Sequence, residues 1–178
     1  MTIPVLATDR LILRGFVEAD LDALAAMMAK PEVARFIAPA PMTRADAWRS
    51  MASTLGHWAL RGYGAWAVER RGDGALVGRV GMINPEGWPA LEIGWALDSA
   101  HWGQGYASEA AAAAMRFAFL TQPVDRLISN IDPDNTPSQA VAKRLGERCG
   151  ERIALTVQGK DYAVDSWFIA RDEWQRRA

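Results

Sequence analysis

The sequence contains little of what disulfide frameworks, zinc sites and membrane helices require. Cys149 is the only cysteine among 178 residues, and the chain has two histidines. One cysteine excludes an internal disulfide, and so few donors do not favour a Cys/His zinc site. We therefore expect no metal and interpret Cys149 as a small core residue. No apolar run approaches the roughly 20 residues that a membrane helix needs, so we expect no membrane partner.

An excess of one charge is missing as well. The 20 Lys and Arg residues and the 21 Asp and Glu residues leave a net charge of -1. Binding to a phosphate backbone needs a basic face that this balance does not provide, so we expect no nucleic-acid partner. Residues 1–5 have neither the basic start nor the apolar stretch of a signal peptide, which indicates a cytoplasmic protein.

The residues that are present, of which 50% are apolar, fit one domain spanning residues 1–178. Helical segments follow a first strand, and short β-type runs separated by turns then predict an antiparallel meander. We expect strands at residues 9–16, 65–70, 76–83, 91–97, 126–131, 153–157 and 162–170. We expect helices at residues 20–30, 43–58, 105–120 and 137–145.

The most informative stretch is a strand that runs into a glycine-containing turn and then a helix. Residues 91–97 form the strand, and Gly103 and Gly105 stand where the next helix begins. Several backbone N–H groups can converge there, and the first turn of a helix leaves N–H donors unpaired at the positive end of its dipole. Such a turn can bind an anion such as pyrophosphate. The alternative is a glycine turn that only starts a tightly packed helix, since the Walker and dinucleotide patterns are absent.

The same stretch resembles a known signature. Trp-Gly-Gln-Gly-Tyr-Ala at residues 102–107 is similar to the acetyl-CoA signature Q/R-x-x-G-x-G/A of the GNAT superfamily of N-acetyltransferases. Continued by Ser-Glu-Ala, it resembles the form of the ribosomal-protein N-terminal (RimJ/RimL-type) branch, with Trp102 in place of the usual Gln or Arg. The resemblance extends to Leu-Ile-Leu-Arg at 11–14, Glu-Ile-Gly-Trp at 92–95, Asn-Thr-Pro-Ser at 135–138, Arg-Leu-Gly at 144–146 and Asp-Glu-Trp at 172–174.

This resemblance implies a mixed α+β fold, with a central, mostly antiparallel, twisted sheet of about seven strands and helices on both faces. The fourth and fifth strands, residues 91–97 and 126–131, are expected to splay apart and to hold the acetyl thioester in the opening. The implied activity is transfer of an acetyl group from acetyl-CoA to a primary amine by direct attack in a ternary complex. Dimers are common in this branch, which makes a homodimer a candidate assembly, and the sequence leaves the oligomeric state open.

The resemblance also implies cofactor-binding positions. Backbone groups of Trp95 and Leu97 are expected to pair with the pantetheine arm as an added strand would. Asn135 is expected to bond the pantetheine or orient the acceptor, and the alternative is a turn-forming Asn. Lys143 and Arg144 are candidates for the 3′-phosphate, although charges on a helix are commonly solvated. The pyrophosphate is expected to bind, mainly through backbone amides, around Trp102, Gly103, Gln104, Gly105, Tyr106, Ala107 and Ser108.

Two residues are candidates for catalysis, which needs a neutral amine and a group that protonates the departing thiolate. Glu92 interrupts an apolar strand where the family commonly has a carboxylate facing the acceptor. The alternative is a structural partner for a buried arginine or a backbone amide. Ser138 corresponds to a residue proposed to meet the thiolate, with Thr136 as the expected helix cap, and the alternative is a helix-start residue only. Ala142 stands where many of these enzymes have a tyrosine acid, so the acid is Ser138, a water or nothing.

The sequence leaves the acceptor open between a protein N-terminus and a small amine. A second hypothesis is a non-catalytic module that binds or senses acyl-CoA. The missing tyrosine permits it, whereas Glu92, Asn135 and Ser138 together argue against it.

Overall fold

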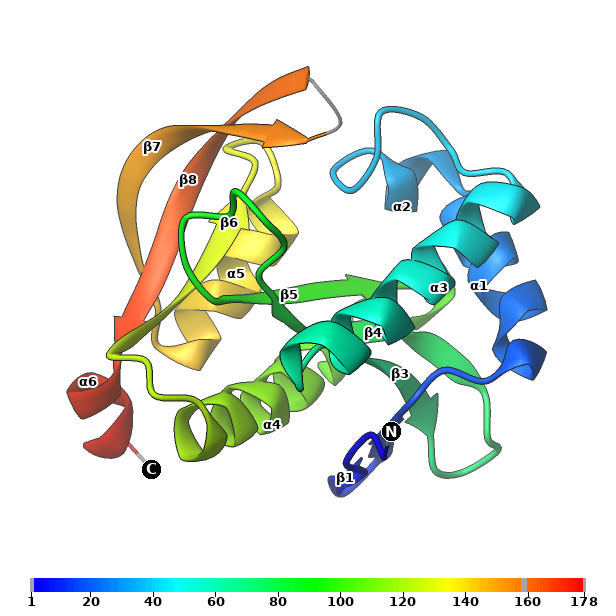
Figure 1. Ribbon diagram of the computed structural model, residues 1–178, viewed down its shortest axis with the longest axis horizontal. Coiled ribbons are helices and arrows are strands. Elements are labelled where there is room, and N and C mark those ends of the chain that lie inside the picture. Colours follow the sequence, from blue (N-terminus) through cyan, green and yellow to red (C-terminus); the bar gives the residue numbers. More distant parts are fainter. Residues whose placement is uncertain (1, 158–159, 178) are drawn as a thin grey trace.

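The computed structural model describes residues 2–157 and 160–177. Its strands form an eight-stranded sheet in the order β1-β2-β3-β4-β5-β6-β8-β7, with helices on both faces (Figure 1). The strands are β1 (Leu6–Ala7), β2 (Leu11–Arg14), β3 (Ala65–Arg70), β4 (Leu76–Ile83), β5 (Glu92–Leu97), β6 (Arg126–Ile131), β7 (Arg148–Val157) and β8 (Lys160–Ala170). The helices are α1 (Leu21–Met28), α2 (Pro31–Ala34), α3 (Arg44–Arg61), α4 (Tyr106–Thr121), α5 (Thr136–Leu145) and α6 (Arg171–Gln175), with 3-10 helices η1 (Glu18–Asp20) and η2 (Ser99–His101).

The expected fold is confirmed, with two corrections at the edges of the sheet. The additional strand is β1, where Leu6 lies opposite Leu13 of β2. Two residues are too few for an alternating pattern to reveal. At the other edge, β7 begins earlier than expected, because a register shift between Cys149 and Arg152 interrupts its alternation. Cys149 is exposed rather than buried in the core, because it lies on this edge strand.

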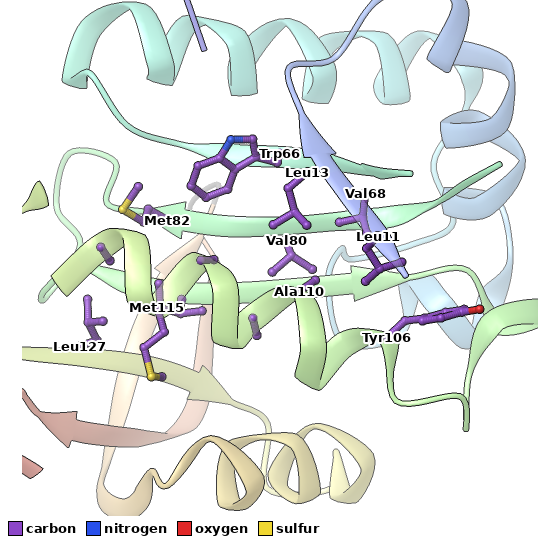
Figure 2. Close-up of a cluster of buried hydrophobic side chains, with 14 of the residues drawn as sticks. Leu11, Leu13, Trp66, Val68, Val80, Met82, Tyr106, Ala110, Met115 and Leu127 are labelled. Carbon is purple, nitrogen blue, oxygen red and sulfur yellow. The ribbon is translucent and has the colours of Figure 1, made fainter. Parts of the chain in front are cut away.

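Neighbouring side chains of the sheet pack against helices on opposite faces. Trp66 and Val68 of β3 belong to a buried cluster that includes Met115 of α4 (Figure 2). Ala67, which lies between them, belongs to a second cluster with residues of α1 and α3. Helix α5 packs on β6 beside α4. In the described part of the chain, no helix combines the length and apolar character of a membrane span.

Candidate functional site

The sheet opens between β5 and β6, the two strands that were expected to splay. They pair in parallel with Glu92 opposite Ile128. A parallel ladder would next bond the Asn130 N–H to the Ile93 carbonyl. Instead, the Asn130 N–H donates to the Glu92 carboxylate, and the Ile93 carbonyl accepts a hydrogen bond from Ser129 Oγ at 2.8 Å. The ladder therefore ends shortly after it begins.

Glu92 lies at the start of this opening and is 7% exposed. Its Oε2 accepts hydrogen bonds from Trp88 Nε1 and Asn130 Nδ2, both at 2.7 Å. Burial disfavours the charged form more than these bonds favour it, and it raises the pKa of Glu92 to about 7. The structural alternative for Glu92 was a partner for a buried arginine or for a backbone amide. The Asn130 N–H is such a backbone amide. The two side-chain donors, from Trp88 and Asn130, are neutral groups and not an arginine. A carboxyl with this pKa is suited to accept a proton near neutral pH.

A second buried carboxyl, which was not predicted from the sequence, lies close to Glu92. Glu147 follows α5 and is 5% exposed, with Oε1 at 3.0 Å from Ser129 Oγ. Burial raises the pKa of Glu147 to about 8, and the negative charge of Glu92 adds to this rise. A single charged residue directly after the helix-ending Gly146 carries no pattern that predicts burial.

The glycine turn precedes α4 and leaves the first turn of that helix uncapped. Gly103 and Gly105 have φ values of 74° and 81°, in the left-handed region that favours glycine. Gly105 is the N-cap residue, and as a glycine it has no side chain to cap the helix. Ser108 Oγ is buried without a hydrogen-bond partner among the described residues. Backbone N–H groups in the first turn of a helix fit an anion such as the pyrophosphate of acetyl-CoA.

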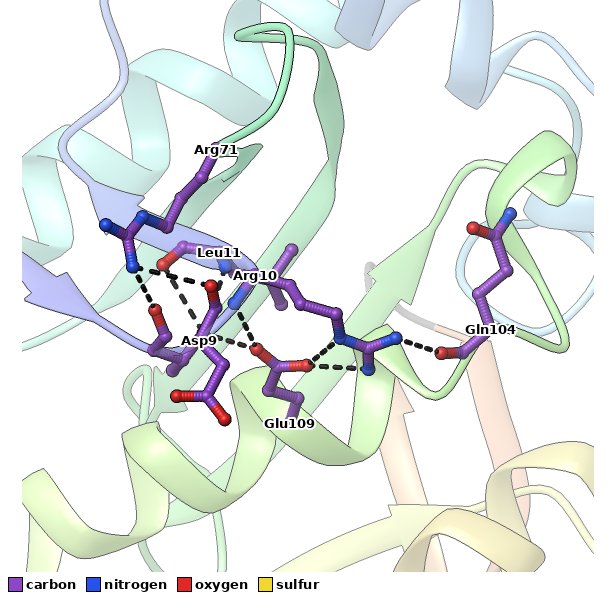
Figure 3. Close-up of polar contacts among 7 residues, drawn as sticks. Asp9, Arg10, Leu11, Arg71, Gln104 and Glu109 are labelled. Atoms are coloured by element: carbon purple, nitrogen blue, oxygen red, sulfur yellow. Dashed lines mark hydrogen bonds and ion pairs between the residues drawn. The ribbon is translucent and has the colours of Figure 1, made fainter.

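Arg10, which the sequence analysis also missed, braces this turn (Figure 3). Its Nη1 donates to the Gln104 carbonyl at 2.9 Å, and its Nε donates to Glu109 Oε2 at 2.7 Å. The guanidinium also lies over the Tyr106 ring, 4.7 Å from its centroid. These contacts tie the turn and the start of α4 to the chain before β2. Local patterns could not reveal them, because 94 positions separate Arg10 from Gln104.

The edge of β5 beyond the ladder carries Trp95 and Leu97. Backbone groups of a strand face its two neighbours alternately. Because the Ile93 carbonyl faces β6, the backbone groups of Trp95 and Leu97 face the same side. The Leu97 carbonyl accepts a bond from Trp102 Nε1 at 2.9 Å, and Trp102 is 48% exposed. Beyond Glu92, no residue pair of the described chain continues the β5–β6 ladder, so this edge of β5 is suited to pair with an extended ligand.

Helix α5 lies across the opening and begins differently from the expectation. Asn135, rather than Thr136, is the N-cap, and its side-chain oxygen accepts the Ser138 N–H at 3.2 Å. Pro137, which has no N–H to satisfy, occupies the second helical position instead of the first, so the cap moves back by one residue. Asn135 therefore caps α5, and its contact with the pantetheine or the acceptor stays a prediction. Ser138 Oγ accepts a bond from Trp95 Nε1 at 3.2 Å, which brings these two candidates together.

The structure does not bring every candidate to the opening. Lys143 and Arg144 are exposed in the last turn of α5, and Lys143 Nζ lies 5.7 Å from the centroid of the Trp167 ring. Among the described residues, no hydrogen bond or ion pair joins Arg144 to the glycine turn, so its contact with a 3′-phosphate stays a prediction. Within residues 2–157 and 160–177, no group of three or more His, Cys, Asp or Glu could hold a metal ion.

Comparisons with known proteins agree with this geometry. A family model described as "Acetyltransferase (GNAT) domain" matches residues 10–148. "Uncharacterized N-acetyltransferase p20" of Bacillus licheniformis is 32% identical over 136 residues, 75% of this chain and 76% of that protein. A crystal structure of an acetyltransferase from Agrobacterium tumefaciens str. C58 has a TM-score of 0.81 and 31% identity, and covers 95% of each chain. RimL in complex with coenzyme A shares the fold, with a TM-score of 0.76 and 20% identity over 94% of this chain and 98% of that chain.

Proposed function

Since the chain belongs to the GNAT acetyltransferase family and is an N-acetyltransferase, we propose that it transfers acetyl from acetyl-CoA to a primary amine by direct attack in a ternary complex. The observation that carries the proposal is the Glu92 carboxyl, buried where β5 and β6 separate and with a pKa of about 7. The acceptor is proposed to be a protein N-terminal amine or a small-molecule amine. We propose that residues 1–178 act as one domain, as a monomer or a homodimer.

Acetyl-CoA, when bound, supplies the thioester carbonyl that the amine attacks. We assign its pyrophosphate to the backbone N–H groups from Gly103 to Ala107, at the positive end of the α4 dipole. Ser108, whose Oγ is buried, is assigned to the same group through its backbone N–H, which belongs to the first turn of α4. The backbone groups of Trp95 and the N–H of Leu97 are assigned to the amides of the pantetheine arm, in the manner of an added strand, while the Leu97 carbonyl is already bonded to Trp102 Nε1.

Glu92 is proposed to take the proton that the attacking amine loses. A protein α-amine has an ordinary pKa near 8 and an alkyl amine one near 10, so most of either is protonated at pH 7. An ionised carboxylate with a pKa of about 7 accepts this proton directly or through one water. The bonds from Trp88 and Asn130 to Oε2 orient the carboxylate.

Ser138 is proposed to protonate the departing thiolate. Its hydroxyl accepts the Trp95 indole N–H and therefore keeps its own proton for donation. A water molecule is the alternative acid. Ser138→Ala is expected to lower kcat and to leave the KM for acetyl-CoA nearly unchanged when the hydroxyl is the acid. An unchanged kcat would assign the role to water.

Release of free thiol from acetyl-CoA tests the function. The acceptors are peptides with free N-termini, amino acids, polyamines and aminoglycosides. We expect thiol release with at least one class, and we expect Glu92→Gln to lower it while acetyl-CoA binding persists. Binding of acetyl-CoA with no thiol release across all acceptors would instead favour a non-catalytic acyl-CoA-binding or sensing module.

A further inference from the structure

Ile93, Ser129 and Glu147 form a hydrogen-bonded chain beside the opening, and its geometry restricts where the protons lie. Ser129 Oγ is 2.8 Å from the Ile93 carbonyl oxygen and 3.0 Å from Glu147 Oε1. A hydroxyl has one proton to donate, and a carbonyl can only accept. The proton of Ser129 therefore goes to Ile93. The second contact needs another proton, and the Glu147 carboxyl is the partner that can carry it.

The surroundings of Glu147 favour this neutral form. Ser129 is 2% exposed and Glu147 is 5% exposed. Glu147 Oε2 is buried and has no hydrogen-bond partner within the described part of the chain. A buried carboxylate oxygen without a donor is costly when charged and far less so when the acid is neutral. The pKa of Glu147, raised to about 8, agrees with the proton count.

No cation is among the causes of the raised pKa of Glu147, which are burial, opposed by the Ser129 hydrogen bond, and the charge of Glu92. Glu92 faces Glu147 from β5 and repels its charge. Arg148 forms an ion pair with Glu173 at 3.0 Å, and its side chain is 59% exposed, so water screens it. Arg176 is paired with Asp172 and is 65% exposed. Glu147 lines a hollow of about 350 Å³, and the other charged residues that line it are Lys143, Arg148, Glu173, Arg176 and Arg177.

We propose that Glu147 is a positioning residue that works as a neutral acid. Glu147 donates to Ser129, and Ser129 donates to the Ile93 carbonyl. These two hydrogen bonds hold β6 to β5 where the opening begins. The bond from Ser129 replaces the ladder bond that the Ile93 carbonyl would otherwise accept from the Asn130 N–H. The Asn130 N–H is therefore free to donate to Glu92. The role of Glu147 in acetyl transfer rests on the proposed function, which assigns the pantetheine arm to this opening.

Unfolding by urea at a series of pH values tests the protonation of Glu147, with Glu147→Gln as the comparison. An unfolded glutamate loses its proton near pH 4.3, whereas folded Glu147 keeps it up to a pH of about 8. The wild type therefore loses stability as the pH rises through this window. The ratio of unfolding constants, wild type over Glu147→Gln, is expected to rise by up to about tenfold per pH unit. A ratio independent of pH overturns the proposal.

Activity separates positioning from mere packing. Gln can donate to Ser129 as the neutral acid does, so Glu147→Gln is expected to retain a KM for acetyl-CoA close to that of the wild type. Glu147→Leu and Ser129→Ala each remove the hydrogen bonds that link Glu147, Ser129 and Ile93, and each is expected to raise this KM. The KM of the double variant is expected to be no higher than that of the poorer single variant. Equal impairment by Gln and Leu at position 147 would contradict the proposal.

The two readouts distinguish this proposal from the proposed function. Unfolding does not depend on turnover. A pH-dependent ratio in a protein that transfers no acetyl group would reject the proposed function and leave the neutral Glu147 intact. A constant ratio in an active acetyltransferase would reject the role of Glu147 alone.

Discussion

Replacing Asn130 with alanine is expected to move the pH dependence of acetyl transfer to higher pH. Asn130 Nδ2 donates to Glu92 Oε2 at 2.7 Å, which favours the ionised carboxylate. A hydrogen bond to a charged group contributes about 1.5 kcal/mol or more, and one pKa unit corresponds to about 1.4 kcal/mol. Loss of the bond therefore raises the pKa of Glu92 by about one unit, from about 7 to about 8. Trp88 and the backbone N–H at position 130 still donate, which limits the shift.

The assay is the initial rate of thiol release from pH 6 to pH 9 with one amine acceptor. Glu92 accepts a proton only when ionised, so the rate rises with pH through its pKa. At pH 6 the ionised fraction is about tenfold lower in Asn130→Ala than in the wild type, whereas at pH 9 the two fractions are nearly equal. Trp88→Phe removes the other side-chain donor to Oε2 and is expected to shift the profile in the same direction.

The matched control is Asn135→Ala, which removes a side-chain amide that caps α5 and does not bond Glu92. Its pH profile is expected to have the wild-type midpoint. The assignment of Glu92 as the titrating base would be refuted by an Asn130→Ala profile that is lower by a constant factor at every pH.

Two further predictions concern stability. Asn135→Ala is expected to lower the free energy of unfolding by about 1 kcal/mol, measured with urea, because it removes the α5 cap. Asp20 accepts two bonds of 2.8 Å from Arg14, and Asp20→Ala is expected to cost about 2 kcal/mol in the same measurement. Burial opposes the charge of Asp20, but the bonds from Arg14 and the Val17 N–H hold its pKa below the ordinary value. This stabilisation is present at neutral pH and is lost in acid, so below pH 4 the wild type is expected to lose stability more steeply than Asp20→Asn.

Much of the fold could be predicted because the relevant patterns are local. The strands expected at residues 65–70, 76–83 and 126–131 match β3, β4 and β6, since short apolar runs between turns identify strands directly. The two-residue β1 escaped prediction because pairing with β2, rather than its own sequence, makes it a strand. Cys149 was misplaced because nothing local indicates that β7 forms an edge of the sheet.

The candidate site could be predicted only in part, for a physical reason. Glu92 and Ser138 were candidates by resemblance, but the partners of Glu92 are decided by where the β5–β6 ladder ends. The Asn130 side chain and its N–H both reach Glu92 because of that ending. Ser129 and Glu147 come together only when β6 and the end of α5 are packed. Such contacts depend on tertiary structure, and the spacing of residues along the chain does not encode them.

The claim on which the function depends is that the backbone N–H groups from Gly103 to Ala107 bind the pyrophosphate of acetyl-CoA. At Gly105, with φ of 81°, a Cβ would lie 3.4 Å from Arg10 Nη2, and the left-handed backbone costs a side chain about 1–2 kcal/mol. Gly74, with φ of 73° and no atom within 4 Å of such a Cβ, supplies a control with similar strain in the β3–β4 turn.

Calorimetric titration with acetyl-CoA compares the wild type, Gly105→Ala and Gly74→Ala. We expect the wild type and Gly74→Ala to bind alike, and Gly105→Ala to bind about tenfold more weakly. A wild type that does not bind acetyl-CoA, or a Gly105→Ala variant that binds as tightly as Gly74→Ala, would contradict the assignment of this turn.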